Sequence, residues 1–230
     1  MPRFFNRIAP GSPPVNATVH PLLWGTVGLW AVIQLVTDLA DAGLAPRIFE
    51  PWGMYYRFAF DNGDLQLAFA GRGVDPQMLW ALVTHAFLHA GWLHLATNAA
   101  IFLAFGHGIS HDAGIRATLV IFLLTAAAGA LTYGLLSSEP GALVGASGGT
   151  SGFIGVFLCW RERWLARHGM ARDQIWLMVG ALAALNVMVA VGVDSSVAWQ
   201  AHLGGFVVGW LLGYAVPPRR HRARSRARFL

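Results

Sequence analysis

The sequence contains no lysine and only one cysteine, and just 12% of its 230 residues are charged. Soluble domains carry about 25% charged residues, so this deficit argues against a soluble globular protein. A single cysteine, Cys159, excludes a disulfide within the chain. Apolar residues are abundant instead: 56% of the chain is hydrophobic, which indicates an integral membrane protein.

The first nineteen residues contain four prolines and no apolar stretch of the kind found in a cleaved signal peptide. We interpret residues 1–19 as a segment that precedes a membrane domain over residues 20–216, followed by an arginine-rich tail over residues 217–230. A long loop, residues 41–91, separates the first two spans. Its many aromatic residues are typical of a segment that lies partly in the membrane interface.

Six stretches are candidates for crossing the membrane, which takes about 20 apolar residues per helix. They are His20–Ala40, Trp92–His107, Ile115–Leu136, Ser147–Trp160, Gln174–Val193 and Val197–Val216. The second is set apart from apolar residues before it by a break at Gly91. The predicted fold is an all-α polytopic membrane protein with six transmembrane helices.

Arginines are distributed unevenly about these spans. Thirteen of the 16 lie on the side of the N-terminus, and only Arg47, Arg57 and Arg72 lie on the other. The positive-inside rule therefore predicts that both termini are cytoplasmic, and we expect a multi-pass protein of a bacterial inner membrane. The same asymmetry accounts for the net charge of +5, so the expected partner is the lipid bilayer and not a nucleic acid.

Polar side chains within spans are costly, and they indicate a functional site by default. Four stand out: Ser147 in the fourth span, His202 in the sixth, and His94 and Asn98 in the second. These three spans run in the same direction, from outside to inside. Each polar residue lies in the first turns, within about 10 Å of the outer boundary at 1.5 Å per residue. The predicted topology thus brings them to one level that water can reach.

Glycines recur at helical spacing on two of these spans. They are Gly205, Gly209 and Gly213 in the sixth span, and Gly148, Gly152 and Gly155 in the fourth. Small residues at such spacing let helix backbones approach closely. If the two stripes face each other, Ser147 and His202 meet above the contact. The alternative is helix packing alone, with Ser147 bonded to a backbone carbonyl.

A serine beside a histidine is a nucleophile with its general base. Acyl transfer also needs donors for the oxyanion, and His94 and Asn98 share a helix face at i and i+4. With the backbone N–H of Ser147 they would supply that hole. No acidic residue lies in the membrane near His202, so the predicted catalytic unit is a dyad.

Two other interpretations of these polar residues, a metal site and a solute transporter, are less well supported by the sequence. His85, His89 and His94 with Asn98 suggest a metal cluster, but no carboxylate or thiol completes it, so we expect no metal and no cofactor. His85 and His89 are interpreted as a structural pair bonded to loop backbone. A solute transporter would show inverted repeats, and none is evident. Asn186, in the fifth span, is expected to bond a neighbouring helix.

Three motifs resemble those of the rhomboid intramembrane serine proteases. They are GASG (145–148), AHLGGFVVG (201–209) and HAGWLHLATN (89–98). The resemblance implies the six-helix rhomboid fold, Ser147 as nucleophile and His202 as base. The chain departs from the family at Ser151, where many members have an aromatic residue, and at Ser110, where they often have a glutamate.

The function implied is cleavage of transmembrane segments in single-span membrane proteins, near the outer face. His94, Asn98 and the Ser147 N–H would bind the oxyanion. Gly145 is expected to leave room for the substrate, while Gly148, Gly205 and Gly209 line or pack around the site. The alternative is a catalytically silent rhomboid-like protein that binds membrane clients.

Overall fold

The computed structural model describes residues 10–11, 13, 17–138, 141–192 and 198–218, and this part of the chain is almost entirely helical. The elements in chain order are α1 (Pro21–Asp41), η2 (Arg47–Phe49), α2 (Pro51–Phe58), β1 (Phe60–Asp61), α3 (Asn62–Phe69), α4 (Pro76–Thr84), η3 (His85–Phe87), α5 (Trp92–Ala113), α6 (Ile115–Leu136), β2 (Ala142–Leu143), α7 (Ser147–Arg167), α8 (Asp173–Gly192) and α9 (Trp199–Ala215). β1 and β2 form a short antiparallel pair that the sequence did not predict.

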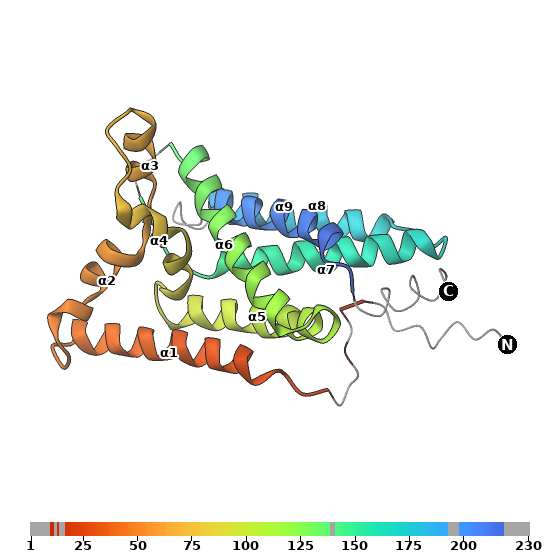
Figure 1. The fold of residues 1–230 in the computed structure, drawn as a ribbon, viewed down its shortest axis with the longest axis horizontal. Helices are drawn as coiled ribbons and strands as arrows, with labels where there is room; N and C mark the ends of the chain where they lie inside the picture. Colours follow the sequence, from red (N-terminus) through yellow and green to blue (C-terminus); the bar gives the residue numbers. More distant parts are fainter. Residues whose placement is uncertain (1–9, 12, 14–16, 139–140, 193–197, 219–230) are drawn as a thin grey trace.

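The bundle is built around helices α6, α7 and α9 (Figure 1). α7 packs most extensively against α9, and α6 packs against both. α5 joins them through α7 and α6, and α1 packs on the outer side of α5. In the part of the chain that the structure describes, α8 makes few contacts, shared between α9 and α7, so it is the most loosely attached of the long helices there.

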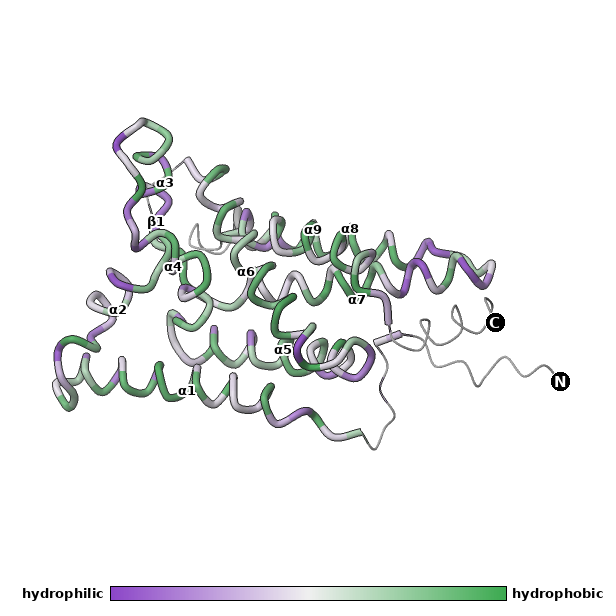
Figure 2. Tube along the Cα trace, in the orientation of Figure 1, coloured by the Kyte–Doolittle hydropathy of each residue, from purple (hydrophilic) through white to green (hydrophobic). Residues whose placement is uncertain are grey.

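Hydropathy divides the molecule into an apolar middle and two polar ends (Figure 2). Polar residues gather around α2, α3 and β1 at one end and at the far end of α7 at the other. By length and composition, α1 and α6 qualify as membrane spans, and α4–η3 with α5 qualify as one bent span. This is the arrangement of an all-α polytopic membrane protein.

Helix limits agree with the predicted spans where a helix and its apolar run end together, as for Ile115–Leu136. Two spans were predicted too short: α5 continues past His107 to Ala113, and α7 past Trp160 to Arg167. In α7, Arg161, Glu162 and Arg163 end the hydrophobic run, but Arg and Glu are good helix formers, so the helix continues into the polar end.

The predicted loop 41–91 is largely helical, and its last part forms α4 and η3. The α4–η3 segment meets α5 at an angle of 85°. Gly91, at the break, has φ +116°, a conformation that side chains with a Cβ rarely adopt. Just after it, Trp92 donates a 2.7 Å hydrogen bond from Nε1 to Asp38 Oδ2, which ties the start of α5 to the end of α1. The break at Gly91 is confirmed.

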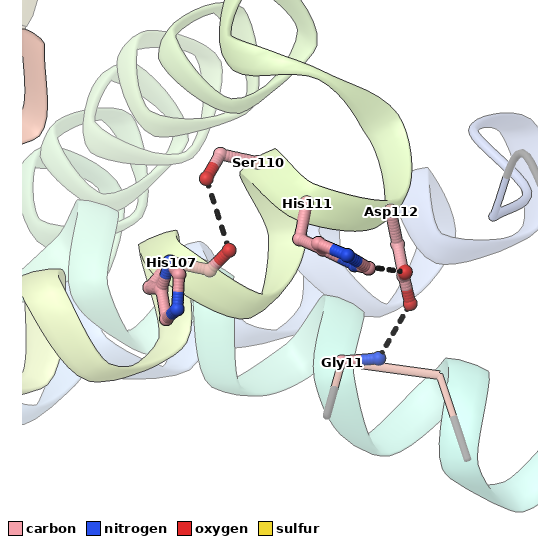
Figure 3. Close-up of polar contacts among 5 residues, drawn as sticks. All are labelled: Gly11, His107, Ser110, His111 and Asp112. Carbon is pink, nitrogen blue, oxygen red and sulfur yellow. Dashed lines mark hydrogen bonds and ion pairs between the residues drawn. The ribbon is translucent and has the colours of Figure 1, made fainter. Parts of the chain in front are cut away.

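At the other end of α5, a buried carboxylate holds the segment before α1 (Figure 3). Asp112 is 4% exposed and accepts a 2.7 Å hydrogen bond from the N–H of Gly11, while its other oxygen lies 2.9 Å from His111 Nδ1. Ser110, where the resemblance leads one to expect a glutamate, donates to the His107 carbonyl. Asp112 thus supplies the acidic anchor of this helix end.

Candidate functional site

Ser147 is the first residue of α7, and the turn before it depends on a glycine. Gly145 has φ +115°, and its N–H donates a 2.9 Å hydrogen bond to the carbonyl of His85. The segment between β2 and α7 is therefore anchored on the η3 segment. The first N–H groups of a helix have no partner within it, so the Ser147 N–H is available as a donor.

The absence of a side chain at Gly145 makes room for an imidazole. A Cβ there would lie 2.5 Å from Cε1 and 2.7 Å from Nε2 of His94. The His94 ring therefore packs directly against Gly145. The consequence is a direct contact between the start of α7 and the second polar helix, α5.

The two glycine stripes face each other across the α7–α9 contact. A Cβ at Gly205 would collide with the Gly148 carbonyl oxygen, and one at Gly209 with the Gly152 carbonyl oxygen. A Cβ at Gly148 would lie 3.4 Å from the carbonyl oxygen of Ala201. Ser147 precedes Gly148 in α7, and His202 follows Ala201 in the first turn of α9. The close approach of the backbones therefore brings the serine and the histidine to the same end of the helix pair.

His202 is held from the side by α8. Its Nδ1 lies 2.8 Å from Oδ1 of Asn186, and the ring is half-buried. The hydrogen bonds of the described residues include none between the Ser147 hydroxyl and the His202 ring. Such contacts are often long in free enzymes and tighten when substrate binds.

His94 and Asn98 are oriented as hydrogen-bond donors. The backbone N–H of Ala90 donates to His94 Nδ1 at 3.4 Å, so Nδ1 accepts and the neutral ring carries its proton on Nε2, which faces Gly145. Asn98 donates one amide hydrogen to the His94 carbonyl at 3.1 Å. An amide nitrogen has two hydrogens, so one remains for another acceptor.

Thr150 is a site residue that the sequence did not single out. Its hydroxyl lies 3.4 Å from Asn98 Oδ1 and 3.1 Å from the Ser147 carbonyl, and the residue is 2% exposed. The His94 carbonyl, which can only accept, holds the nitrogen of the Asn98 amide, so Oδ1 is the atom that lies beside the Thr150 hydroxyl. The only signal in the sequence is a polar side chain one turn after Ser147.

His85 and His89, which precede His94 in the sequence, differ in their hydrogen bonding. His85 Nδ1 bonds the Ala81 carbonyl at 2.9 Å, so it does bond backbone, but the backbone of helix α4 and not of a loop as expected. His89 was expected to bond backbone too, and that is wrong: both its ring nitrogens are buried without a partner, beside the rings of Trp30 and His94. The described residues contain no group of three or more His, Cys, Asp or Glu arranged to hold a metal ion.

Comparison with known proteins identifies related chains. A family model described as Rhomboid domain matches residues 76–219. RHOMBOID-like protein 1 of Arabidopsis thaliana is 28% identical over 141 residues, which cover 61% of this chain and 35% of that protein. RHOMBOID-like protein 6, mitochondrial, of the same plant is 27% identical over 135 residues, or 59% and 43%. The chain spans less than half the length of these plant relatives. An uncharacterized protein of Mycobacterium tuberculosis is 31% identical over 169 residues, 68% of each chain.

Proposed function

The chain belongs to the rhomboid family, and from this premise we propose that it is an intramembrane serine endopeptidase with Ser147 as nucleophile and His202 as general base. The observation that carries the proposal is the close approach of α7 and α9, where Gly148 and Gly205 bring the starts of both helices together. A serine and a histidine on two helix starts held this way form a nucleophile–base pair.

The reaction proceeds by acyl transfer in two steps. His202 Nε2 takes the hydroxyl proton of Ser147 as Oγ bonds to the carbonyl carbon of the scissile peptide. The imidazolium then gives that proton to the leaving amine as the C–N bond breaks, which leaves an acyl-enzyme. Water attacks this ester in the same way, with His202 as base, and releases the carboxyl product and the free serine.

The negative charge on the carbonyl oxygen needs fixed donors. The three proposed donors are the backbone N–H of Ser147, the Nε2–H of His94 beside Gly145, and the second amide hydrogen of Asn98. His94 and Asn98 belong to one helix, where the Ala90 N–H donates to the His94 ring and the Asn98 amide donates to the His94 carbonyl. Donors held in advance stabilise the oxyanion without reorganisation at the moment of reaction.

The substrates in this proposal are single-span membrane proteins, cut near the outer face, with both termini of the enzyme in the cytoplasm. A peptide bond within an intact helix is shielded by its own turn, and its carbonyl is already hydrogen-bonded. Only a segment that unwinds easily is attacked. We therefore expect a small residue such as alanine before the cut, and glycine, proline or polar residues in the adjoining turns.

The proposal is tested with the purified chain reconstituted in vesicles. The substrate is a single-span protein with Gly and Pro at the outer end of its span, and a matched version carries leucine at those positions. We expect a cut near the outer end, mapped by mass spectrometry, and much slower cleavage of the leucine version. A fluorophosphonate probe is expected to label Ser147.

Absence of both labelling and cleavage would reject the protease function and leave a client-binding protein. A cut at the cytoplasmic end would reject the orientation. Equal cleavage of both substrate versions would reject the requirement for unwinding.

Removing one proposed oxyanion donor is expected to slow the reaction without abolishing it. We expect Asn98→Ala or His94→Ala to lower kcat by about 10- to 100-fold, which is less than the factor of about 10²–10³ reported for one such donor in a soluble protease, because two donors remain. KM is expected to change little, since the charge develops only in the transition state. Thermal unfolding checks that each variant folds. Full kcat in both variants would assign the oxyanion to other groups.

A further inference from the structure

A polar amide interrupts the lipid-exposed part of α8. Asn186 lies among Leu185, Val187 and Met188, which are at least half exposed on the surface of the bundle, whereas Asn186 itself is half-buried. An amide at membrane depth is costly unless it is bonded. Its two hydrogen-bonding groups both face α9, at Trp199 and His202.

The two contacts of Asn186 determine on which side its amide oxygen and its amide nitrogen lie. Nδ2 lies 3.3 Å from the Trp199 carbonyl oxygen, which can only accept, so the NH₂ group must be on that side. Oδ1 is then directed at His202 Nδ1, 2.8 Å away, and it can only accept. It follows that the neutral His202 ring carries its proton on Nδ1, and that Nε2 holds the lone pair.

This tautomer is the one that base catalysis at His202 requires. We propose that Asn186 is a positioning residue for His202: its amide holds the Nδ1–H tautomer and the ring orientation, so that Nε2 is the atom that takes the Ser147 proton. The inference rests on the proposed protease function. It extends the predicted dyad by a neutral third member, supplied by the most loosely attached long helix.

The same bond serves both protonation states of His202. When Nε2 takes the serine proton, Nδ1–H remains donated to Asn186 Oδ1, so the ring need not turn during the reaction. An amide cannot take the second proton itself, and its role is confined to holding the ring. The third member of a serine–histidine–aspartate set orients its histidine in the same way.

The test compares two replacements of Asn186 with a control on the same helix. Asn186→Leu has nearly the same size and removes both hydrogen bonds, while Asn186→Asp keeps an acceptor for Nδ1–H. Leu185→Ala alters the neighbouring, lipid-exposed position. ¹⁵N NMR of histidine-labelled protein without substrate reports which nitrogen of His202 carries the proton, with the His202 signals assigned by their absence in His202→Gln. kcat and KM are measured on the single-span substrate.

In the wild type and in Leu185→Ala, the proton is expected on Nδ1. Asn186→Leu is expected to populate the Nε2–H tautomer and to lower kcat about tenfold or more with little change in KM, as loss of one hydrogen bond to the base implies. Asn186→Asp is expected to keep the Nδ1–H tautomer and recover part of kcat.

Three results would overturn the positioning role. One is an unchanged tautomer in Asn186→Leu, which would leave Asn186 as a tether of α8 only. Another is wild-type kcat despite a changed tautomer. The third is an Asn186→Asp variant as slow as Asn186→Leu with its proton still on Nδ1. A wild type that neither cleaves nor labels would instead reject the protease function, while the position of the proton, measured without substrate, would still decide the bond to Asn186.

Discussion

Replacing Ser147 by alanine is expected to abolish cleavage, and replacing His202 by alanine is expected to do the same. In the proposed mechanism, the first change removes the atom that bonds to substrate, and the second removes the acceptor of its proton. In soluble serine proteases such losses lower kcat by about 10⁴- to 10⁶-fold, which takes turnover below detection in a membrane assay.

The double variant provides the sharper measurement. Because the two residues act as one unit, Ser147→Ala combined with His202→Ala is expected to be no slower than either single variant. Two independent contributions would multiply instead. Cleavage is measured in detergent under single-turnover conditions, with enzyme in excess over substrate. This assay remains sensitive at very low rates.

A matched control lies one turn further along α7. Ser151→Ala removes a hydroxyl from the same helix without touching the proposed pair, and we expect its kcat and its labelling by the fluorophosphonate probe to stay near wild type. Cleavage that persisted in Ser147→Ala or in His202→Ala would refute the assignment of nucleophile and base. Loss of activity in Ser151→Ala would extend the site beyond these two residues.

The helices could be predicted because a membrane-spanning run is a signal that each segment carries by itself. Ile115–Leu136 is both an apolar run and a helix, so its limits agree. The far end of α7 could not be placed, because Arg161–Arg167 is polar while it remains helical. α4 was assigned to a loop because its apolar run is short, and only its 85° junction with α5 shows how it joins a span.

The site was predictable as a set of residues but less so as a set of contacts. Shared direction and depth select Ser147, His202, His94 and Asn98 from the sequence. Their partners depend on which faces of the helices meet, and apolar helices carry little amphipathic pattern to indicate that. Asn186 could be expected to bond a neighbouring helix, but its bond to His202 requires the structure.

Glycine at the α7–α9 contact is expected to be required for stability itself. A methyl group at Gly205 would collide with the carbonyl oxygen of Gly148, and one at Gly209 with that of Gly152. These obstacles are backbone atoms within a helix, which cannot turn aside as a flexible side chain can. The two helices would have to separate, and the contacts of α6 with both would loosen as well.

Two other helical glycines serve as controls for the same chemical change. A Cβ at Gly28 in α1 or at Gly180 in α8 would meet no heavy atom within 4 Å. Alanine is favoured over glycine within a helix by about 0.5–1 kcal/mol, so these substitutions are expected to be neutral or slightly stabilising. Replacing glycine by alanine should therefore lower stability at the α7–α9 contact but leave it unchanged or raise it at Gly28 and Gly180.

We expect Gly205→Ala and Gly209→Ala each to lower the free energy of unfolding by about 3 kcal/mol, at the upper end of the range for overpacking, because the obstacle is backbone. Gly205→Ala should also lower kcat in the molecules that remain folded, since Gly205 is one turn from His202 and lies against Gly148, which follows Ser147 in α7. Unfolding is measured in mixed detergent micelles by titration with a denaturing detergent, and kcat at a detergent fraction where every variant is folded. Equal stability of Gly205→Ala, Gly209→Ala, Gly28→Ala and Gly180→Ala would show that α7 and α9 do not approach as closely as the structure requires, and the proposed meeting of Ser147 and His202 would lose its main support.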